Sequence, residues 1–190
     1  MNFYILTGGR SRRLGRDKAL LRLDGQTLPE RILSSIPAGY PTKIVSNSSQ
    51  AFEFIECPVI TDIHQGLGPI GGIHAGLSDT TSDFGFFIAC DLPFITQTLI
   101  LRILQNHTDE DVFGIRGKDG NVPLCTIYSK RGLAVIDSQI LNKEYSLSRL
   151  SKLLHSAFIE ATDELDLLNV NTERDWRTAQ NLARKRNCPN

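Results

Sequence analysis

Short apolar runs alternate with segments of helical periodicity through most of the chain. The apolar runs predict buried strands at residues 2–7, 42–47, 58–61, 84–90 and 157–161. Two more strands are expected at 111–116 and 121–128, joined by a hairpin-type turn at 118–120. The helical pattern covers residues 27–36, 70–77, 96–106, 130–141, 146–155 and 172–184, with a short helix from about residue 50.

Helix-start signals support several of these helices. Thr27-Leu28-Pro29-Glu30 combines an N-cap threonine, a proline in the first turn and a glutamate that can complete a capping box. Thr96 is a candidate cap, and Thr172-Glu173-Arg174-Asp175 supplies another capping box. Residues 18–24 are expected to be extended as far as a turn at Asp24-Gly25.

The alternation of strands and helices predicts an α/β fold, with a mostly parallel central sheet covered by helices on both faces. The 190 residues suit one domain, and no linker or internal repeat divides residues 1–190. Ligands of such sheets bind at the carboxyl ends of strands. Because Gly8-Gly9, Asn47, Asp62 and Asp91 each follow a predicted strand, we expect them along one rim.

The composition is globular, with 41% apolar and 22% charged residues. Lys+Arg and Asp+Glu both number 21, so no basic excess indicates a nucleic acid or a membrane as partner. The 4 cysteines form no C-x-x-C pair and are typical of reduced cytoplasmic thiols. The first residues carry no basic region and only a short apolar run, so neither a signal peptide nor a membrane span is expected.

The balanced total hides an uneven distribution of charge. Five bases lie between positions 10 and 18, with Asp17 as the one acid among them. Residues 51–111 carry nine acids and one base, Arg102. Like charges repel in a short loop unless an anion lies among them, so the basic segment favours a polyanionic ligand.

The segment Leu6–Lys18 has the chemistry of a phosphate-binding loop. Gly8 and Gly9 follow a strand, where their N–H groups can approach a phosphate or a base closely. The arginines and Lys18 can add charge-assisted hydrogen bonds to phosphate oxygens. The segment fits neither a Walker A loop nor a Rossmann fingerprint. A basic surface loop with a glycine turn is the alternative.

Carboxylates and amides supply the other candidates. Asp91, at the mouth of the most apolar strand, is well placed to hold Mg²⁺, which needs only one or two protein carboxylates beside phosphates and water. Asp62, before the glycine-rich segment 66–76, could accept from a ribose or a base. Asn169-Val170-Asn171-Thr172 and Asn121-Val122-Pro123-Leu124 could contact a polar heterocycle. Each of these also has an ordinary structural explanation, as a turn or a helix cap.

No other catalytic chemistry is indicated. The histidines are scattered and no mixed His/Cys set suggests zinc. Ser11 and Cys90 could act as nucleophiles, but the sequence places no His/Asp partner beside either of them.

The segment Leu6-Thr7-Gly8-Gly9-Arg10-Ser11-x-Arg13-Leu14-Gly15-x-Asp17-Lys18 resembles the signature of MobA-like nucleotidyltransferases. The resemblance continues in order through segments along essentially the whole chain: Asn47, Asp62, Gly68-Pro69-Ile70-Gly71-Gly72-Ile73, Ala89-Cys90-Asp91-Leu92-Pro93, Pro123-Leu124 and Asn169-Val170-Asn171-Thr172. The sequence departs from the usual pattern at Thr7 and Gly71, where alanine is usual, and at Leu14, where methionine is common.

The resemblance implies a Rossmann-like, three-layer α/β/α fold in a cytoplasmic enzyme. It implies Mg²⁺-dependent transfer of GMP from GTP to molybdenum-loaded molybdopterin, which yields the guanine dinucleotide and pyrophosphate. The implied partners extend to other molybdenum cofactor biosynthesis proteins and recipient molybdoenzymes. By motif position, Lys18, Asp91 and Arg13 would be catalytic and Asp91 would bind the metal. GTP would be bound by Leu6, Thr7, Gly8, Gly9, Lys18, Asn47, Asp62 and Asp91.

Two other functions stay open at this point. A related enzyme could transfer a different nucleotide, from CTP to molybdopterin or from an NTP to a sugar or alditol phosphate. A carrier could bind GTP or the cofactor without catalysis, although the presence of both Lys18 and Asp91 argues for chemistry. A screen of the four NTPs for pyrophosphate release separates these functions.

Overall fold

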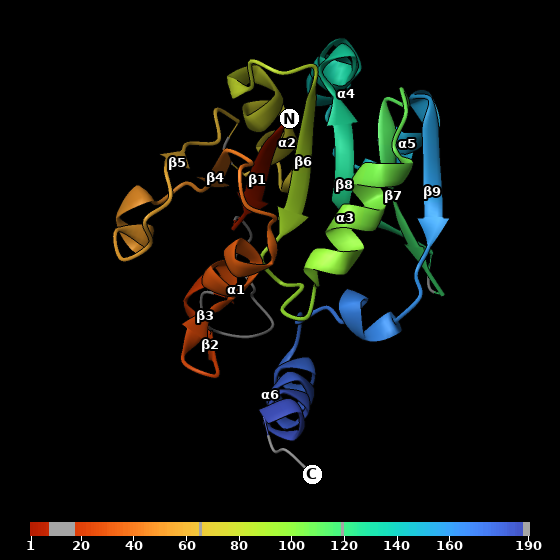
Figure 1. Ribbon diagram of the computed structural model, residues 1–190. Coiled ribbons are helices and arrows are strands. Elements are labelled where there is room, and N and C mark those ends of the chain that lie inside the picture. Colours follow the sequence, from red (N-terminus) through yellow and green to blue (C-terminus); the bar gives the residue numbers. More distant parts are fainter. Residues whose placement is uncertain (8–17, 65, 119, 188–190) are drawn as a thin grey trace.

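The computed structural model describes residues 1–7, 18–64, 66–118 and 120–187. Its main sheet has the strand order β5-β4-β1-β6-β8-β7-β9 (Figure 1). The strands of this sheet are β1 (Asn2–Leu6), β4 (Thr42–Val45), β5 (Val59–Ile60), β6 (Phe84–Ala89), β7 (Val112–Gly117), β8 (Gly120–Ser129) and β9 (Ser156–Glu160). β8 runs antiparallel to both of its neighbours and every other pairing in the sheet is parallel, which confirms the mostly parallel α/β prediction.

Helices cover both faces of this sheet. They are α1 (Leu28–Ser35), α2 (Pro69–Asp79), α3 (Gln97–Asn106), α4 (Leu133–Leu141), α5 (Leu147–Leu153) and α6 (Glu173–Asn187). Alternate residues of β1 pack into the two hydrophobic clusters on opposite faces of the sheet, because successive side chains of a strand point to opposite faces. Phe3 and Ile5 pack with α1 and α3, whereas Tyr4 and Leu6 pack with α2, α4 and α5. The result is the expected three-layer α/β/α arrangement.

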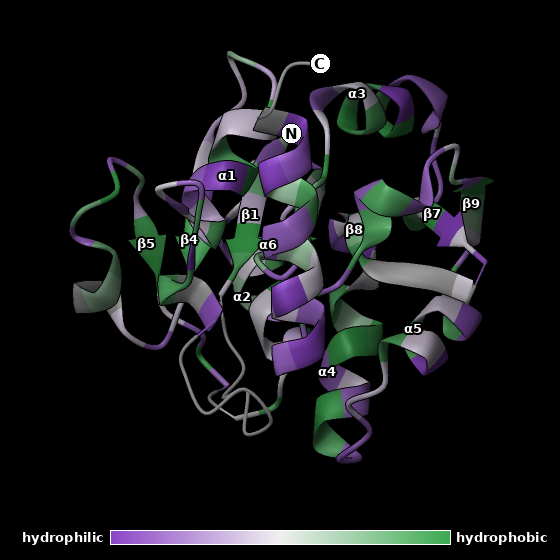
Figure 2. Cartoon of the chain, turned by 90° about the horizontal axis from the view of Figure 1, so that it is seen from below, coloured by the Kyte–Doolittle hydropathy of each residue, from purple (hydrophilic) through white to green (hydrophobic). Residues whose placement is uncertain are grey.

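α6 lies at the carboxyl edge of the parallel strands rather than in either helical layer (Figures 1 and 2). A third apolar cluster holds it there, and its buried members are Leu21, Leu23, Leu28, Phe94, Val170, Trp176, Ala179 and Ala183. This cluster joins α6 to the loop after β6 and to a small hairpin, β2 (Arg22–Leu23) with β3 (Gln26–Thr27). The hairpin turns at Asp24 and Gly25, whose φ angles of 51° and 83° match a tight two-residue turn.

The predicted elements are confirmed with a few corrections. Residues 18–20 are not extended but form a 3-10 turn, η1 (Lys18–Leu20), closed by the Leu21 N–H on the Lys18 carbonyl at 3.1 Å. The pattern also missed β3 and a 3-10 turn, η4 (Glu164–Leu167). The helix expected from residue 50 is another 3-10 turn, η2 (Ser49–Phe52), and the segment 130–141 begins as η3 (Lys130–Gly132) before α4.

The helix caps are as predicted. Thr27 and Glu30 form the full capping box of α1, and the Thr96 side chain accepts from the Leu99 N–H at the start of α3. None of the helices in the described part of the chain is both long enough and apolar enough to cross a membrane.

Candidate active site

The carboxyl ends of four neighbouring parallel strands form the rim of the candidate site. β5, β4, β1 and β6 lie side by side in that order, so the residues that follow them share one edge of the sheet. The residues in these places are Asp62, Asn47, Thr7 and Asp91. The structure therefore brings together the rim that the sequence predicted, as far as it is described; Gly8, Gly9 and Arg13 lie outside the described residues.

Asp91 is a partly buried carboxylate with only part of its hydrogen-bonding capacity used. Its Oδ2 lies 3.3 Å from the Lys18 ammonium nitrogen, and the two side chains are 20% and 13% exposed. Its Oδ1 is buried with no hydrogen-bond partner among the described residues. Burial raises the pKa of the Asp91 carboxyl, and the nearby Lys18 charge opposes that rise. A second cation at Oδ1 would therefore stabilise the ionised form of this carboxylate.

Lys18 bridges two segments that are far apart in the sequence. Its Nζ donates to Asp91 Oδ2 and, at 2.5 Å, to Asn171 Oδ1. The same two segments also meet through the main chain, where the Val170 N–H donates to the Asp91 carbonyl at 2.9 Å. The sequence pointed to Asn171 only as a possible contact of a heterocycle, and its bond to Lys18 was not foreseen.

The third apolar cluster explains why these polar groups meet. Leu21 follows the η1 turn that carries Lys18, Phe94 lies three residues after Asp91, and Val170 directly precedes Asn171. All three are buried in one cluster with Trp176 of α6. Burial of apolar side chains therefore fixes the three segments relative to one another, and their polar side chains converge at the edge of that cluster.

Asp62 is held at the other end of the rim. It is 8% exposed, and its Oδ1 accepts from the His64 N–H at 2.8 Å. Burial raises the pKa of Asp62, while the His64 N–H and the charges of His64 and His74 oppose the rise. The carboxylate lies against Gly71 of α2, where a Cβ would come within 2.7 Å of Oδ2 and 2.8 Å of Oδ1.

Two histidines extend this end of the site, and the sequence analysis did not single them out. The rings of His64 and His74 meet edge to face with centroids 4.7 Å apart, and His74 Nε2 lies 3.0 Å from Asp137 Oδ1 on α4. His74 Nδ1 is buried without a partner among the described residues. The only available signal was that His64 precedes the glycine-rich segment and His74 lies within it.

Of the remaining predicted residues, Thr7 and Leu6 are buried and Asn47 is exposed. Thr7 is buried and its hydroxyl donates to the Val45 carbonyl at 2.9 Å, which ties β1 to β4. Leu6 is 6% exposed and its Cδ2 would lie 3.0 Å from a Cβ at Gly72, so its side chain contributes to packing against α2. Asn47 is exposed at the end of β4.

The Asn121–Leu124 and Asn169–Thr172 segments both reach the carboxyl end of β6. The β8 register pairs Cys125 with Ile88, so Leu124 lies beside the carboxyl end of β6. Val170 bonds to Asp91 directly through the main chain. The two segments therefore flank the end of β6.

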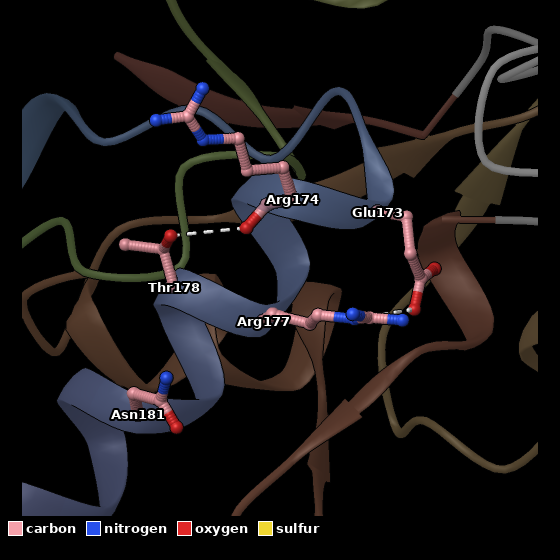
Figure 3. Close-up of a pocket in the computed structure, with 5 residues that line it drawn as sticks. All are labelled: Glu173, Arg174, Arg177, Thr178 and Asn181. Atoms are coloured by element: carbon pink, nitrogen blue, oxygen red, sulfur yellow. Dashed lines mark hydrogen bonds and ion pairs between the residues drawn. The ribbon is translucent and has the colours of Figure 1, made fainter.

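A shallow hollow of about 390 Å³ opens on the polar side of α6. Figure 3 shows its lining residues, Glu173, Arg174, Arg177, Thr178 and Asn181. Arg177 pairs with Glu173 at 3.8 Å, and the Thr178 hydroxyl donates to the Arg174 carbonyl at 3.0 Å. The hollow is lined by α6 alone and contains none of the predicted site residues.

The described side chains limit how a metal ion could be bound. Among the residues that the structure describes, no group of three or more His, Cys, Asp or Glu side chains is placed to hold a metal ion. A cation at Asp91 would therefore share one carboxylate with ligand oxygens and water, as Mg²⁺ does in phosphate-binding sites. Asn171 Oδ1 is a neutral oxygen that accepts from the same Lys18 ammonium as Asp91 does.

Comparison with known proteins gives consistent matches. The model of the MobA-like NTP transferase domain matches residues 3–159. The chain is 30% identical over 181 residues to the molybdenum cofactor guanylyltransferase of Vibrio cholerae, covering 92% of this chain and 88% of that protein. It is 31% identical to the enzyme of the same name from Desulfosudis oleivorans, covering 93% and 92%.

A solved structure agrees in fold. The crystal structure of molybdopterin-guanine dinucleotide biosynthesis protein A from Archaeoglobus fulgidus superposes with a TM-score of 0.83 at 24% identity, covering 97% of this chain and all of that one. At this identity the likeness supports the fold alone. The matched family model covers most of the chain, including β1 and the loop with Asp91. The chain belongs to the family of MobA-like NTP transferases.

Proposed function

We propose that this protein transfers GMP from GTP to molybdenum-loaded molybdopterin, giving the guanine dinucleotide and pyrophosphate. The observation that carries the proposal is the meeting of Lys18, Asp91 and Asn171 at the carboxyl edge of β6, with the buried Asp62 at the other end of the same rim. Cation and carboxylate lie where a parallel α/β sheet binds nucleotides. The names of the curated relatives agree with this chemistry.

Asp91 fits a divalent cation, which we take to be Mg²⁺. Its Oδ1 is buried and unpartnered among the described residues, and burial raises its pKa, so the carboxylate lacks a counter-charge on that side. Bound there, Mg²⁺ would neutralise charge on the α-phosphoryl group and on the leaving pyrophosphate.

The chain's own residues position the phosphates and offset their charge. The attacking phosphate of the acceptor is already an anion at pH 7, so the site needs no strong general base. Lys18 stabilises charge that grows on pyrophosphate, and Arg13 and the Gly8 and Gly9 N–H groups are assigned to the same task. Lys18 first has to exchange Asp91 for a phosphate oxygen, while Asn171 keeps it near the site.

The nucleoside is assigned to the other end of the rim. Asp62, Asn47, Thr7 and Leu6 lie at the ends of β5, β4 and β1, on the side of Asp91 away from β8. Asp62 is the ribose or base acceptor in this arrangement. The acceptor molecule is assigned to the β8 side, between Asn121–Leu124 and Asn169–Thr172.

The proposal extends to the setting of the reaction. Residues 1–190 act as one catalytic domain in the cytoplasm, where the product passes to recipient molybdoenzymes, with other molybdenum cofactor biosynthesis proteins as partners. Neither nucleic acid nor a membrane has a part in it.

The test is pyrophosphate release from each of the four NTPs with Mg²⁺, with and without molybdopterin. Release from GTP that requires both Mg²⁺ and molybdopterin is expected. Release from CTP instead assigns the chain to a cytidylyl-transferring enzyme, and GTP binding without release assigns it to the carrier class. Either of those results overturns the proposal.

A further inference from the structure

The capping box of α6 has one hydrogen bond more than a capping box requires. Asp175 Oδ2 accepts from the Thr172 N–H at 2.8 Å, and the Asp175 N–H donates to Thr172 Oγ1 at 3.2 Å, which completes the box. The same Oδ2 also accepts from the Asn171 N–H at 3.0 Å. Asn171 precedes the cap residue, so this third bond fixes a residue outside the helix.

Asn171 is the residue that meets Lys18. Its Oδ1 accepts from Lys18 Nζ at 2.5 Å, so the carboxylate of Asp175 is connected to the ammonium group through one residue's main chain and side chain. The bonds to Asp175 and to Lys18 both restrain the position of Asn171. Through Asn171, Asp175 is therefore linked to one of the two groups that accept from the Lys18 ammonium, the other being Asp91.

The negative charge of Asp175 also favours a position of the Lys18 ammonium close to Asn171. Burial of Asp175 opposes its ionisation. Its pKa nevertheless lies below the ordinary value, because the carboxylate accepts from the N–H groups of Asn171 and Thr172 and from the Thr172 hydroxyl, and because the Lys18 charge is nearby. The group is thus an anion at neutral pH. An anion beside α6 attracts the Lys18 ammonium toward Asn171 even when Asp91 is engaged elsewhere.

We propose that Asp175 is a positioning residue for Lys18, acting through Asn171 and through its own charge. The inference rests on the proposed function only in that Lys18 is the group that stabilises the leaving pyrophosphate. When Asp91 turns to a cation, Asp175 and Asn171 keep the ammonium within reach of the phosphates.

The chain contains a matched control in the capping box of α1. Glu30 Oε2 accepts from Thr27 N at 2.6 Å and from Thr27 Oγ1 at 2.7 Å. Its cationic neighbour is Arg22, at 4.0 Å, rather than a residue of the candidate site. Glu30→Gln removes a capping carboxylate just as Asp175→Asn does, so a role limited to capping predicts the same result for both.

The first readout is the acetylation rate of Lys18 in the ligand-free protein, followed by peptide mass spectrometry. Asp175→Asn is expected to raise that rate roughly threefold or more, because the amine reacts from its released position. Glu30→Gln is expected to leave it unchanged. Thr172→Ala keeps the charge and the Asn171 bond, so it should lower the melting temperature without releasing Lys18. An unchanged rate in Asp175→Asn overturns the inference.

The second readout is steady-state pyrophosphate release from GTP. Asp175→Asn is expected to lower kcat about fivefold with KM for GTP changed less than about twofold, and Asp175→Glu should restore most of the loss. In a Lys18→Met background the effect of Asp175→Asn should vanish, whereas a general structural defect would persist there.

These readouts separate the two proposals. If wild-type protein releases no pyrophosphate but Asp175→Asn releases Lys18 to acetylation, the proposed function fails and the positioning role stands. If turnover is normal and both capping variants behave alike, Asp175 is a helix cap and the positioning role is wrong.

Discussion

Gly71→Ala tests whether the position of the Asp62 carboxylate matters for nucleotide binding. Alanine is usual here in the sequences that this chain resembles, yet the added Cβ would lie 2.7 Å from Asp62 Oδ2, 2.8 Å from Oδ1 and 2.9 Å from the His64 carbonyl oxygen. These separations are well below van der Waals contact. The chain must respond by moving the carboxylate, the His64 main chain or α2.

The magnitude follows from which atom can move. The Asp62 side chain can rotate, but it then loses the 2.8 Å hydrogen bond from the His64 N–H, and a bond to a charged group contributes about 1.5–3 kcal/mol. Overpacking in a buried site costs about 1–3 kcal/mol. Because rotation relieves part of the crowding, the two costs do not add in full. We expect a loss of about 2 kcal/mol in the free energy of unfolding.

The functional consequence is separable from the loss of stability. A displaced Asp62 binds the nucleoside less well but leaves Lys18 and Asp91 in place, so KM for GTP should rise about tenfold while kcat changes little. Urea unfolding measures the first effect and steady-state pyrophosphate release measures the second. Gly132→Ala is the control, since its Cβ would meet only the end of the Leu154 side chain, at 3.1 Å. Unchanged stability and KM in Gly71→Ala would refute this reasoning.

Three further variants test other parts of the account. Asp91→Asn should lower kcat for pyrophosphate release about 10²–10³-fold at saturating Mg²⁺, and a loss under tenfold would count against a role in catalysis. Trp176→Ala should cost about 3–5 kcal/mol in urea unfolding, because a buried side chain of the third apolar cluster is removed. Burial raises the pKa of Asp166 above its ordinary value of 3.8, so the folded protein retains that proton more tightly than the unfolded chain. The stability of the folded protein therefore falls as the pH rises from the ordinary pKa of an aspartate to the raised pKa of Asp166. Asp166→Asn should abolish that part of the fall in pH-dependent denaturation curves, and parallel curves would show that Asp166 does not titrate in this way.

The fold was largely predictable because its signals are local. Strand-length apolar runs, the Thr27–Glu30 box and the Thr96 cap each fix an element without help from distant residues. Residues 18–20 escaped prediction because their 3-10 turn is selected by tertiary packing: Leu21 and Leu23 are buried against α6. Local propensity alone favours an extended segment there equally well.

The candidate site was predictable as a rim but not as a set of contacts. Parallel topology places Asn47, Asp62 and Asp91 on one edge once the strands are assigned. The bond between Lys18 and Asn171 joins residues 153 positions apart, and the third apolar cluster, which no local period reveals, brings them together. The contact of Asp62 with Gly71 depends in the same way on how α2 packs against the end of β5.

The most direct test of the central claim is transfer of the α-phosphate of labelled GTP to molybdopterin by wild-type protein with Mg²⁺. The account predicts that label appears in a guanine dinucleotide of the pterin, with one unlabelled pyrophosphate released per transfer. Transfer of label from CTP but not from GTP, or bound GTP that is never cleaved, would contradict it.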